Sequence, residues 1–190
     1  MIDAKDVIDF WVDQVGPKGW YIQDTDLDAK IKSKFESLWW DIYNGGHGLW
    51  LTYPNGALAY IIVTDQFSRN MFRGAGTAFG TDRLALAAAK SSIKRGWDLR
   101  ITEPVRQFFY MPLMHSESLT DQDRAVRMFM TRMPDTGAGN LLHARAHREV
   151  IRNFGRFPGR NAALNRRATA HEAAYEASGG YGSTFQALAS

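Results

Sequence analysis

The apolar segment 57–63 decides the fold class, because it is the stretch that local propensity would make a β-strand. Tyr60 to Val63 are aromatic and β-branched residues of the kind that strands favour. No second run of this kind occurs in the sequence, so a strand here would find no partner for its backbone hydrogen bonds. The apolar pattern extends from Ala57 to Phe67, which favours a buried helix. We therefore predict an all-α fold in which residues 57–63 are fully buried.

Helical periodicity supports this prediction along most of the chain. Leu27, Ile31, Leu38 and Ile42 recur at helical spacing and form one apolar stripe. Helix start signals stand at Asp3, Asp26, Thr81, Thr120 and Thr169, and stop signals at Gly16, Asn44, Gly96 and Gly155. We expect the rings of Trp11, Trp39, Phe67, Phe108, Phe129 and Phe157 in or near the core.

The size and composition are those of one helical domain. The chain has 190 residues, of which 45% are apolar, so a single core can hold it without metal or disulfide cross-links. We predict a single domain over residues 1–177. The Gly- and Ser-rich stretch that follows predicts a flexible tail over residues 178–190.

Several classes of protein are excluded or disfavoured by composition. The chain has no cysteine, which excludes disulfide frameworks, thiolate zinc sites, iron–sulfur clusters and cysteine nucleophiles. The longest unbroken apolar run, residues 57–63, is too short to span a bilayer. The first residues are acidic where a secretion signal would be basic and then apolar, so we expect a cytoplasmic protein without membrane contact.

Charge is distributed unevenly along the sequence. Residues 1–60 carry a net charge of −4 and residues 61–190 a net charge of +7, and all sixteen arginines lie in the second part. These arginines stand singly among apolar residues, without the clusters and interleaved aromatics of a nucleic-acid binder. Arginine pairs with carboxylate and phosphate in a defined geometry. The pattern therefore indicates either bracing between helices or recognition of an anion, and no nucleic acid.

Four segments combine aromatic and charged residues more densely than an ordinary helix face does. They are residues 65–70 (DQFSRN), 111–117 (MPLMHSE), 143–149 (HARAHRE) and 154–161 (FGRFPGRN).

These segments resemble the motifs of a mainly bacterial family catalogued as domain of unknown function 924. The family motifs are Asp-Gln-Phe-Pro-Arg-Asn, Pro-Leu-x-His-Ser-Glu and His-x-x-x-Ile…Phe-Gly-Arg-Phe-Pro-His-Arg-Asn, and the resemblance covers nearly the whole chain. It implies antiparallel helix pairs in a right-handed, tetratricopeptide-like superhelical array, and no established activity. Two positions depart from the pattern: Ser68 replaces the usual Pro, and Gly159 replaces the usual His.

The first motif places Asp65 and Arg69 four residues apart, so on a helix the two side chains share a face and can pair. Such a pair, with Asn70 at a helix end, either braces the fold or holds Arg69 ready to bind an anion. The second motif offers His115 as a general base with Glu117 as its orienting partner. The alternative is that Glu117 or Ser116 caps a helix while His115 bonds to a backbone carbonyl.

His143 and His147 share a helical face at the spacing of helical zinc sites. However, Ala144 stands where the metalloprotease motif requires Glu, and a third ligand would have to come from elsewhere. We predict no metal and no cofactor, and expect a buried, hydrogen-bonded histidine beside the loop that follows. In that loop Arg156, Arg160 and Asn161 offer donors for carboxylate or phosphate, which can serve a brace or a pocket wall.

Our leading hypothesis is a pocket for a small anionic molecule. Its ligand-binding residues would be Asp65, Arg69, Asn70, His147, Arg156, Arg160 and Asn161, with His115 and Glu117 as a catalytic pair if there is a reaction. The alternative is a helical adaptor that binds a peptide or a partner protein in a groove. Exposed aromatic residues would favour the adaptor, and the candidates are Trp20, Tyr21, Trp50 and Tyr53.

Overall fold

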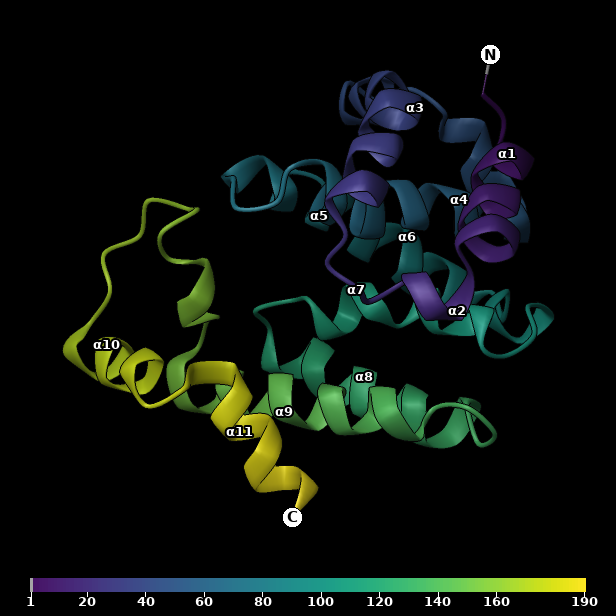
Figure 1. Cartoon of the computed structure of the whole chain (residues 1–190). Coiled ribbons are helices and arrows are strands. Elements are labelled where there is room, and N and C mark those ends of the chain that lie inside the picture. Colours follow the sequence, from purple (N-terminus) through teal and green to yellow (C-terminus); the bar gives the residue numbers. More distant parts are fainter. Residues whose placement is uncertain (1) are drawn as a thin grey trace. The chain divides into compact units, whose positions relative to one another are not determined.

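Helix α4 (Pro54–Ile61) and the π-helical segment η3 (Ile62–Phe67) that continues it form the most buried part of the chain. Residues 57–63 are at most 5% exposed. Pro54 begins α4, at a position where a proline suits a helix because no N–H partner is needed. Within the described residues, 2–190, the computed structural model has helices and no strand (Figure 1). Both the all-α fold and the buried helix are confirmed.

The chain divides into two compact units, Met1–Pro112 and Leu113–Ser190, which we call unit 1 and unit 2. The elements up to the boundary are α1 (Ala4–Ile8), η1 (Asp9–Val15), α2 (Gly16–Gly19), α3 (Thr25–Tyr43), η2 (Gly48–Thr52), α4, η3, α5 (Ser68–Met71), η4 (Gly76–Phe79), α6 (Asp82–Lys94), η5 (Asp98–Arg100), η6 (Val105–Phe109) and α7 (Met111–Met114), which spans the boundary. In unit 1, α4 packs against α1, α6 and two 3-10 segments, η2 and η6, while α3 packs against α5 and η3.

Aromatic rings fill the core of unit 1. Phe67 packs edge-on against Phe10 and Trp11, with ring centroids 5.9 and 5.3 Å away. The six rings expected in the core are all buried, from 0% to 7% exposed. Trp20 and Trp50, which the adaptor hypothesis expected at the surface, are buried too. Trp20 is held inside because its indole N–H donates to a backbone carbonyl at 2.8 Å.

Unit 2 is built on an antiparallel pair of helices, α8 (Leu119–Arg132) and α9 (Ala138–Phe154), joined by a short connection. The pair lies side by side in Figure 1. Gly155 ends α9 with φ +69°, a left-handed conformation that glycine adopts without strain. A 3-10 segment, η7 (Pro158–Arg160), and α10 (Ala170–Ala177) follow, and Thr169 and Glu172 form the predicted capping box of α10.

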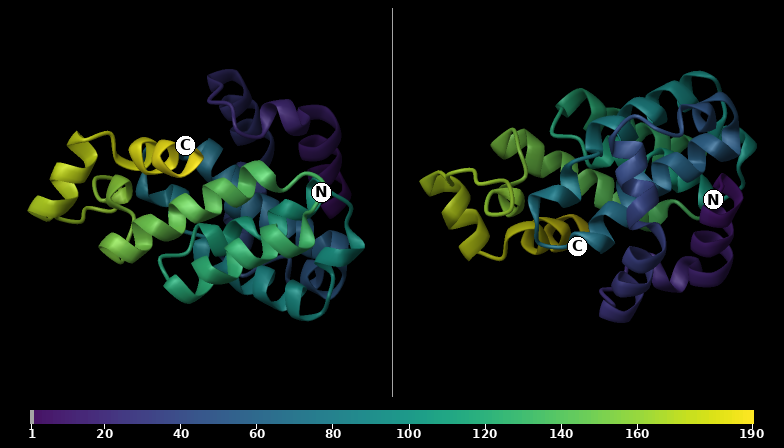
Figure 2. Two further views of the ribbon diagram at one scale, coloured as in Figure 1. Left: turned by 90° about the horizontal axis from the view of Figure 1, so that it is seen from below. Right: turned by 90° about the horizontal axis from the view of Figure 1, so that it is seen from above.

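The segment predicted as a flexible tail contains a helix, α11 (Gly180–Ala189), which packs against α9 (Figure 2). Tyr181 of α11 packs on the small apolar cluster of Val150, Ile151 and Phe157. A sequence rich in Gly and Ser therefore becomes helical because its few aromatic residues meet an apolar surface.

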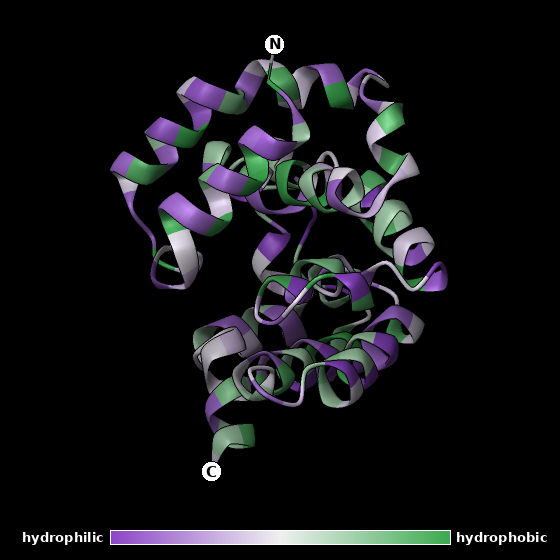
Figure 3. Cartoon of the chain, turned by 90° about the vertical axis from the view of Figure 1, so that its right-hand side faces the viewer, coloured by the Kyte–Doolittle hydropathy of each residue, from purple (hydrophilic) through white to green (hydrophobic). Residues whose placement is uncertain are grey.

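Hydrophilic and hydrophobic residues alternate along the helices, as expected for amphipathic helices with one apolar face (Figure 3). The main difference from the predicted start signals is Thr81, whose hydroxyl makes no capping bond at α6. It instead accepts from Trp39 Nε1 at 3.2 Å and donates to the carbonyl of Thr64 at 2.6 Å. A search of residues 2–190 for a helix long and apolar enough to cross a membrane finds none.

Candidate ligand site

The residues of the first motif lie in unit 1 and are held there by ion pairs and hydrogen bonds. Arg69 Nη1 lies 3.2 Å from Asp65 Oδ1, and Arg69 Nη2 lies 3.0 Å from Asp82 Oδ1. Asn70 donates from Nδ2 to Asp28 Oδ1 at 2.7 Å. These contacts connect η3 and α5 with α6 and α3. The geometry is that of a brace between helices.

Glu117, in unit 2, is the acceptor for a neighbouring arginine that the sequence analysis did not single out. Arg166 donates to both Glu117 oxygens, at 2.8 and 3.0 Å, and the Phe157 backbone N–H donates to Oε1 at 2.9 Å. Burial alone would raise the pKa of Glu117, but Arg166 and the Phe157 N–H lower it below its usual range. Arg166 also donates from Nε to Asn161 Oδ1 at 3.0 Å. Glu117 and Asn161 therefore share one arginine.

Arg156 makes a comparable contact with α10. Its Nη2 donates to Glu172 Oε2 at 2.8 Å and to the Arg167 carbonyl at 3.0 Å. The hydrogen bond from Arg156, followed by that from the Thr169 N–H, lowers the pKa of Glu172 well below its usual range. Because Glu172 also completes the capping box, Arg156 fastens the loop after α9 to the start of α10.

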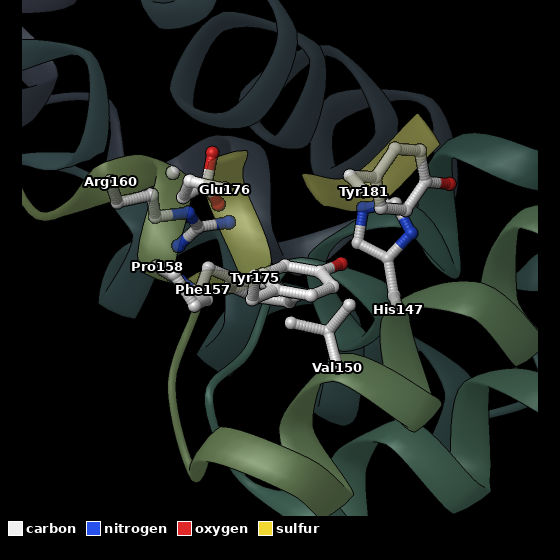
Figure 4. Close-up of a pocket in the computed structure, with 9 residues that line it drawn as sticks. His147, Val150, Phe157, Pro158, Arg160, Tyr175, Glu176 and Tyr181 are labelled. Carbon is white, nitrogen blue, oxygen red and sulfur yellow. The ribbon is translucent and has the colours of Figure 1, made fainter. Parts of the chain in front are cut away.

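Arg160 and His147 line a cavity of about 190 Å³ in unit 2. An engineered apolar cavity of about 150 Å³ holds benzene, so this one has room for a small organic molecule. Figure 4 shows Arg160 and Glu176 on one side of the pocket and His147 and Tyr181 on the other. The full lining is His147, Val150, Phe157, Pro158, Gly159, Arg160, Tyr175, Glu176 and Tyr181.

Contacts with His115 and Phe157 help to hold Arg160 in place. Its Nη2 donates to the carbonyl of His115 at 3.0 Å, and the centre of its guanidinium lies 4.4 Å from the centroid of the Phe157 ring. Stacking on an aromatic ring fixes the plane of a guanidinium. Arg160 is thus a positive charge in a defined orientation at the cavity.

His147 is neutral at physiological pH. Burial lowers its pKa to about 3, and the charges of His115 and Arg160 act in the same direction. Its Nδ1 lies 2.8 Å from the His143 carbonyl, which can only accept, so Nδ1 carries the ring proton. The other nitrogen, Nε2, is then an acceptor, and no group among residues 2–190 hydrogen-bonds to it.

Two further histidines, His115 and His143, lie near this ring. The His115 and His147 ring centroids are 6.2 Å apart. His143 Nδ1 shares a hydrogen bond with the Tyr181 hydroxyl at 2.7 Å, and its ring stacks on Phe185 with centroids 4.4 Å apart. Burial lowers the pKa of His143 and raises that of Tyr181, so both groups are uncharged. In the part of the chain that the structure describes, no three His, Cys, Asp or Glu side chains are grouped as a metal site would require.

The comparisons with known proteins agree with the helical fold. Residues 7–180 match the family described as bacterial protein of unknown function (DUF924). The chain belongs to this family. A solved structure of a protein of unknown function from Agrobacterium tumefaciens superposes with a TM-score of 0.84 at 35% sequence identity, covering 91% of this chain and 96% of that one. A search of curated proteins finds no match.

The DUF924 match contains every predicted site residue, but these residues divide between the units. Asp65, Arg69 and Asn70 lie in unit 1, and the other six lie in unit 2. Within unit 2 only two of the six, His147 and Arg160, line the cavity. A pocket formed by all nine residues stays a prediction.

Sequence reasoning missed Arg166, Tyr175, Glu176 and Tyr181. The unpaired-looking Arg166-Arg167 dipeptide beside the last motif was the available signal for Arg166. Tyr181 stands in the Gly/Ser-rich segment and beyond residue 180, where the DUF924 match ends. Gly159, which departs from the family motif, lines the cavity, and a Cβ there would lie 3.8 Å from Glu176 Oε1.

Proposed function

We propose that unit 2 binds a small monocarboxylate in the cavity between His147 and Arg160. The observation that carries this proposal is the pairing, in one cavity of about 190 Å³, of an oriented guanidinium with a neutral imidazole acceptor. The guanidinium would bind the carboxylate, and His147 Nε2 would accept a hydrogen bond from a hydroxyl or amino group of the same molecule. The aromatic ring of Phe157 supports the apolar part.

Glu176 makes a carboxylate a better ligand than a phosphate. Its carboxylate also lines the cavity, and a dianion would be repelled by it more strongly than a monoanion. A ligand with a donor group beside its carboxylate, such as a hydroxy or amino acid, would satisfy Arg160 and Glu176 together.

Catalysis by the pair His115 and Glu117 has less support than ligand binding by His147 and Arg160. Both Glu117 oxygens accept from Arg166, and the lowered pKa keeps the group ionised as a structural acceptor. We therefore assign Glu117, Asn161 and Arg156 to the frame that positions the loop, and His147 and Arg160 to the ligand. Of the four aromatic residues that the adaptor alternative named, Tyr21 and Tyr53 are exposed, whereas Trp20 and Trp50 are buried.

The test is isothermal titration calorimetry with acetate, lactate, glycine and inorganic phosphate. We expect lactate or glycine to bind more tightly than phosphate. Arg160→Gln should weaken that binding by about tenfold or more, as the loss of a charged hydrogen bond does. Arg167→Gln is the matched control, since the Arg167 side chain is exposed and does not line the cavity. Equal affinity in wild type and Arg160→Gln, or no binding of any of these compounds, would contradict the proposal.

A further inference from the structure

Unit 1 contains a second, larger cavity of about 320 Å³, which shares no residue with the site in unit 2. Its lining comes from η2, α4, α6 and the turn after α6. The residues are Leu51, Tyr60, Leu84, Ala87, Ala88, Ser91, Ser92, Arg95 and Trp97. The space exists because α6 turns its small residues, at positions 87, 88, 91 and 92, toward the larger Tyr60.

Tyr60 brings a hydroxyl group to this cavity. The residue is 5% exposed, no group among residues 2–190 hydrogen-bonds to its hydroxyl, and that oxygen is not among the fully buried ones. A hydroxyl at a cavity wall with no protein partner is open to water or to a ligand. Burial raises the pKa of Tyr60, so the hydroxyl keeps its proton and can donate.

Ser92, on α6, repeats the observation at the same cavity. It is 1% exposed, and its hydroxyl likewise has no hydrogen-bond partner within the described range 2–190. These are two hydroxyls that line one cavity without a protein partner, and both can hydrogen-bond to water or to a polar group of a ligand.

Arg95 supplies a positive charge at the same cavity. The centre of its guanidinium lies 4.7 Å from the centroid of the Trp97 ring, and Nη1 reaches the Leu51 carbonyl at 3.5 Å. No acidic side chain of residues 2–190 pairs with it. Elsewhere in unit 1, by contrast, Arg69 and Arg73 each pair with a carboxylate. An arginine stacked on a tryptophan, without an acidic partner, is suited to bind the carboxylate of a ligand.

We propose that this cavity binds a small aromatic or similarly sized apolar carboxylic acid that carries a hydroxyl group. Arg95 binds the carboxylate, Leu51, Leu84 and Trp97 contact the ring, and Tyr60 and Ser92 hydrogen-bond to the hydroxyl. The volume is about twice that of the benzene-sized cavity, which leaves room for a ring with two substituents.

Three probes separate these contacts: 4-hydroxyphenylacetate, phenylacetate without the hydroxyl, and tyramine with an ammonium in place of the carboxylate. Binding to the full chain is measured by saturation-transfer NMR and calorimetry. We expect 4-hydroxyphenylacetate to bind best and tyramine at least tenfold more weakly. Arg95→Gln should weaken both acids by about tenfold or more. Tyr60→Phe should weaken 4-hydroxyphenylacetate several-fold and leave phenylacetate unchanged.

Arg83→Gln is the matched control, because Arg83 is exposed on the same helix and does not line the cavity. A measurement without ligand tests the site independently: Tyr60→Phe removes only the hydroxyl, so its melting temperature should equal or exceed that of the wild type. A clear drop in melting temperature would mean that the hydroxyl has a structural partner. That drop, a preference for tyramine, failure of both acids to bind, or unchanged affinity in Arg95→Gln would each overturn the proposal.

Discussion

Arg166 shows how much of unit 2 depends on one side chain. It donates to Glu117 in the second motif, and to Asn161 Oδ1 and the Phe157 carbonyl in the last motif. A guanidinium has five N–H donors in a fixed plane, so a single arginine can hold three groups in register. The loop that presents Arg160 to the cavity is positioned in this way.

Arg166→Ala should lower the free energy of unfolding by about 2 to 4 kcal/mol, because breaking a largely buried pair leaves Glu117 without its partner. The side chains of Arg166 and Glu117 are 22% and 29% exposed, which moderates the loss. Urea denaturation followed by circular dichroism measures it. Arg167→Ala, at the exposed neighbouring position, should change the free energy by no more than about 0.5 kcal/mol. Equal losses in the two variants would show that the network contributes no special stability.

Helix α11 completes the cavity of unit 2 although its sequence predicts a tail. Tyr181 lines the cavity, lies with its ring centroid 4.7 Å from that of His147, and bonds to His143. Its helical conformation depends on these contacts, because a segment this short and rich in glycine would not be helical alone.

A chain ending at Ala177 should therefore melt several degrees below the full chain. The loss of α11 uncovers apolar surface on α9. The pKa of His143, measured by NMR titration, should rise because the burial that lowers it is gone. Leu188→Ser, at an exposed position of α11, is expected to have little effect. If the shortened chain melts at the same temperature, then α11 is a tail in solution.

Across the chain, the pKa shifts predict two steps of acid sensitivity. The pKa of His147 falls from about 6.5 in the unfolded chain to about 3 in the fold, so as pH decreases the unfolded chain binds a proton first. Neutral His147 therefore contributes fully to the free energy of unfolding above pH 6.5. This contribution is lost as the pH falls toward 3, and about 2 kcal/mol of it is gone at pH 5. His143, whose pKa is also lowered, adds to the same step.

The second step involves carboxylates of both units. The pKa values of Asp28, Glu117 and Glu172 lie below their usual range, so their contribution is present above about pH 4.5 and is lost as the pH falls further. Melting temperatures at pH 7.5, 5.0 and 3.5 separate the steps. His147→Phe should reduce the loss between pH 7.5 and 5.0 and keep the loss below it. An unchanged loss between pH 7.5 and 5.0 in this variant would refute the assignment to His147.

The features that the sequence by itself determined are local ones. The helix start at Asp3 and the capping box at Thr169 involve residues only three apart, and the buried helix over 57–63 follows from an apolar run with no strand to pair with. The buried rings follow from periodicity, which tells which face of a helix is apolar whatever it packs against.

Only the tertiary structure decided which partner each polar group takes. Glu117 meets Arg166 across 49 residues and Thr81 meets Trp39 across 42, and no local pattern records such separations. The sequence motifs contain these arginines, but the sequence does not show that Arg69 and Arg156 form ion pairs or that Arg160 lines a cavity. Tyr60 reads as an ordinary core residue in the sequence, and its unpartnered hydroxyl becomes visible only when α6 is packed beside it. Cavities and hydrogen-bond partners arise from long-range packing, which is why they could not be predicted from neighbouring residues alone.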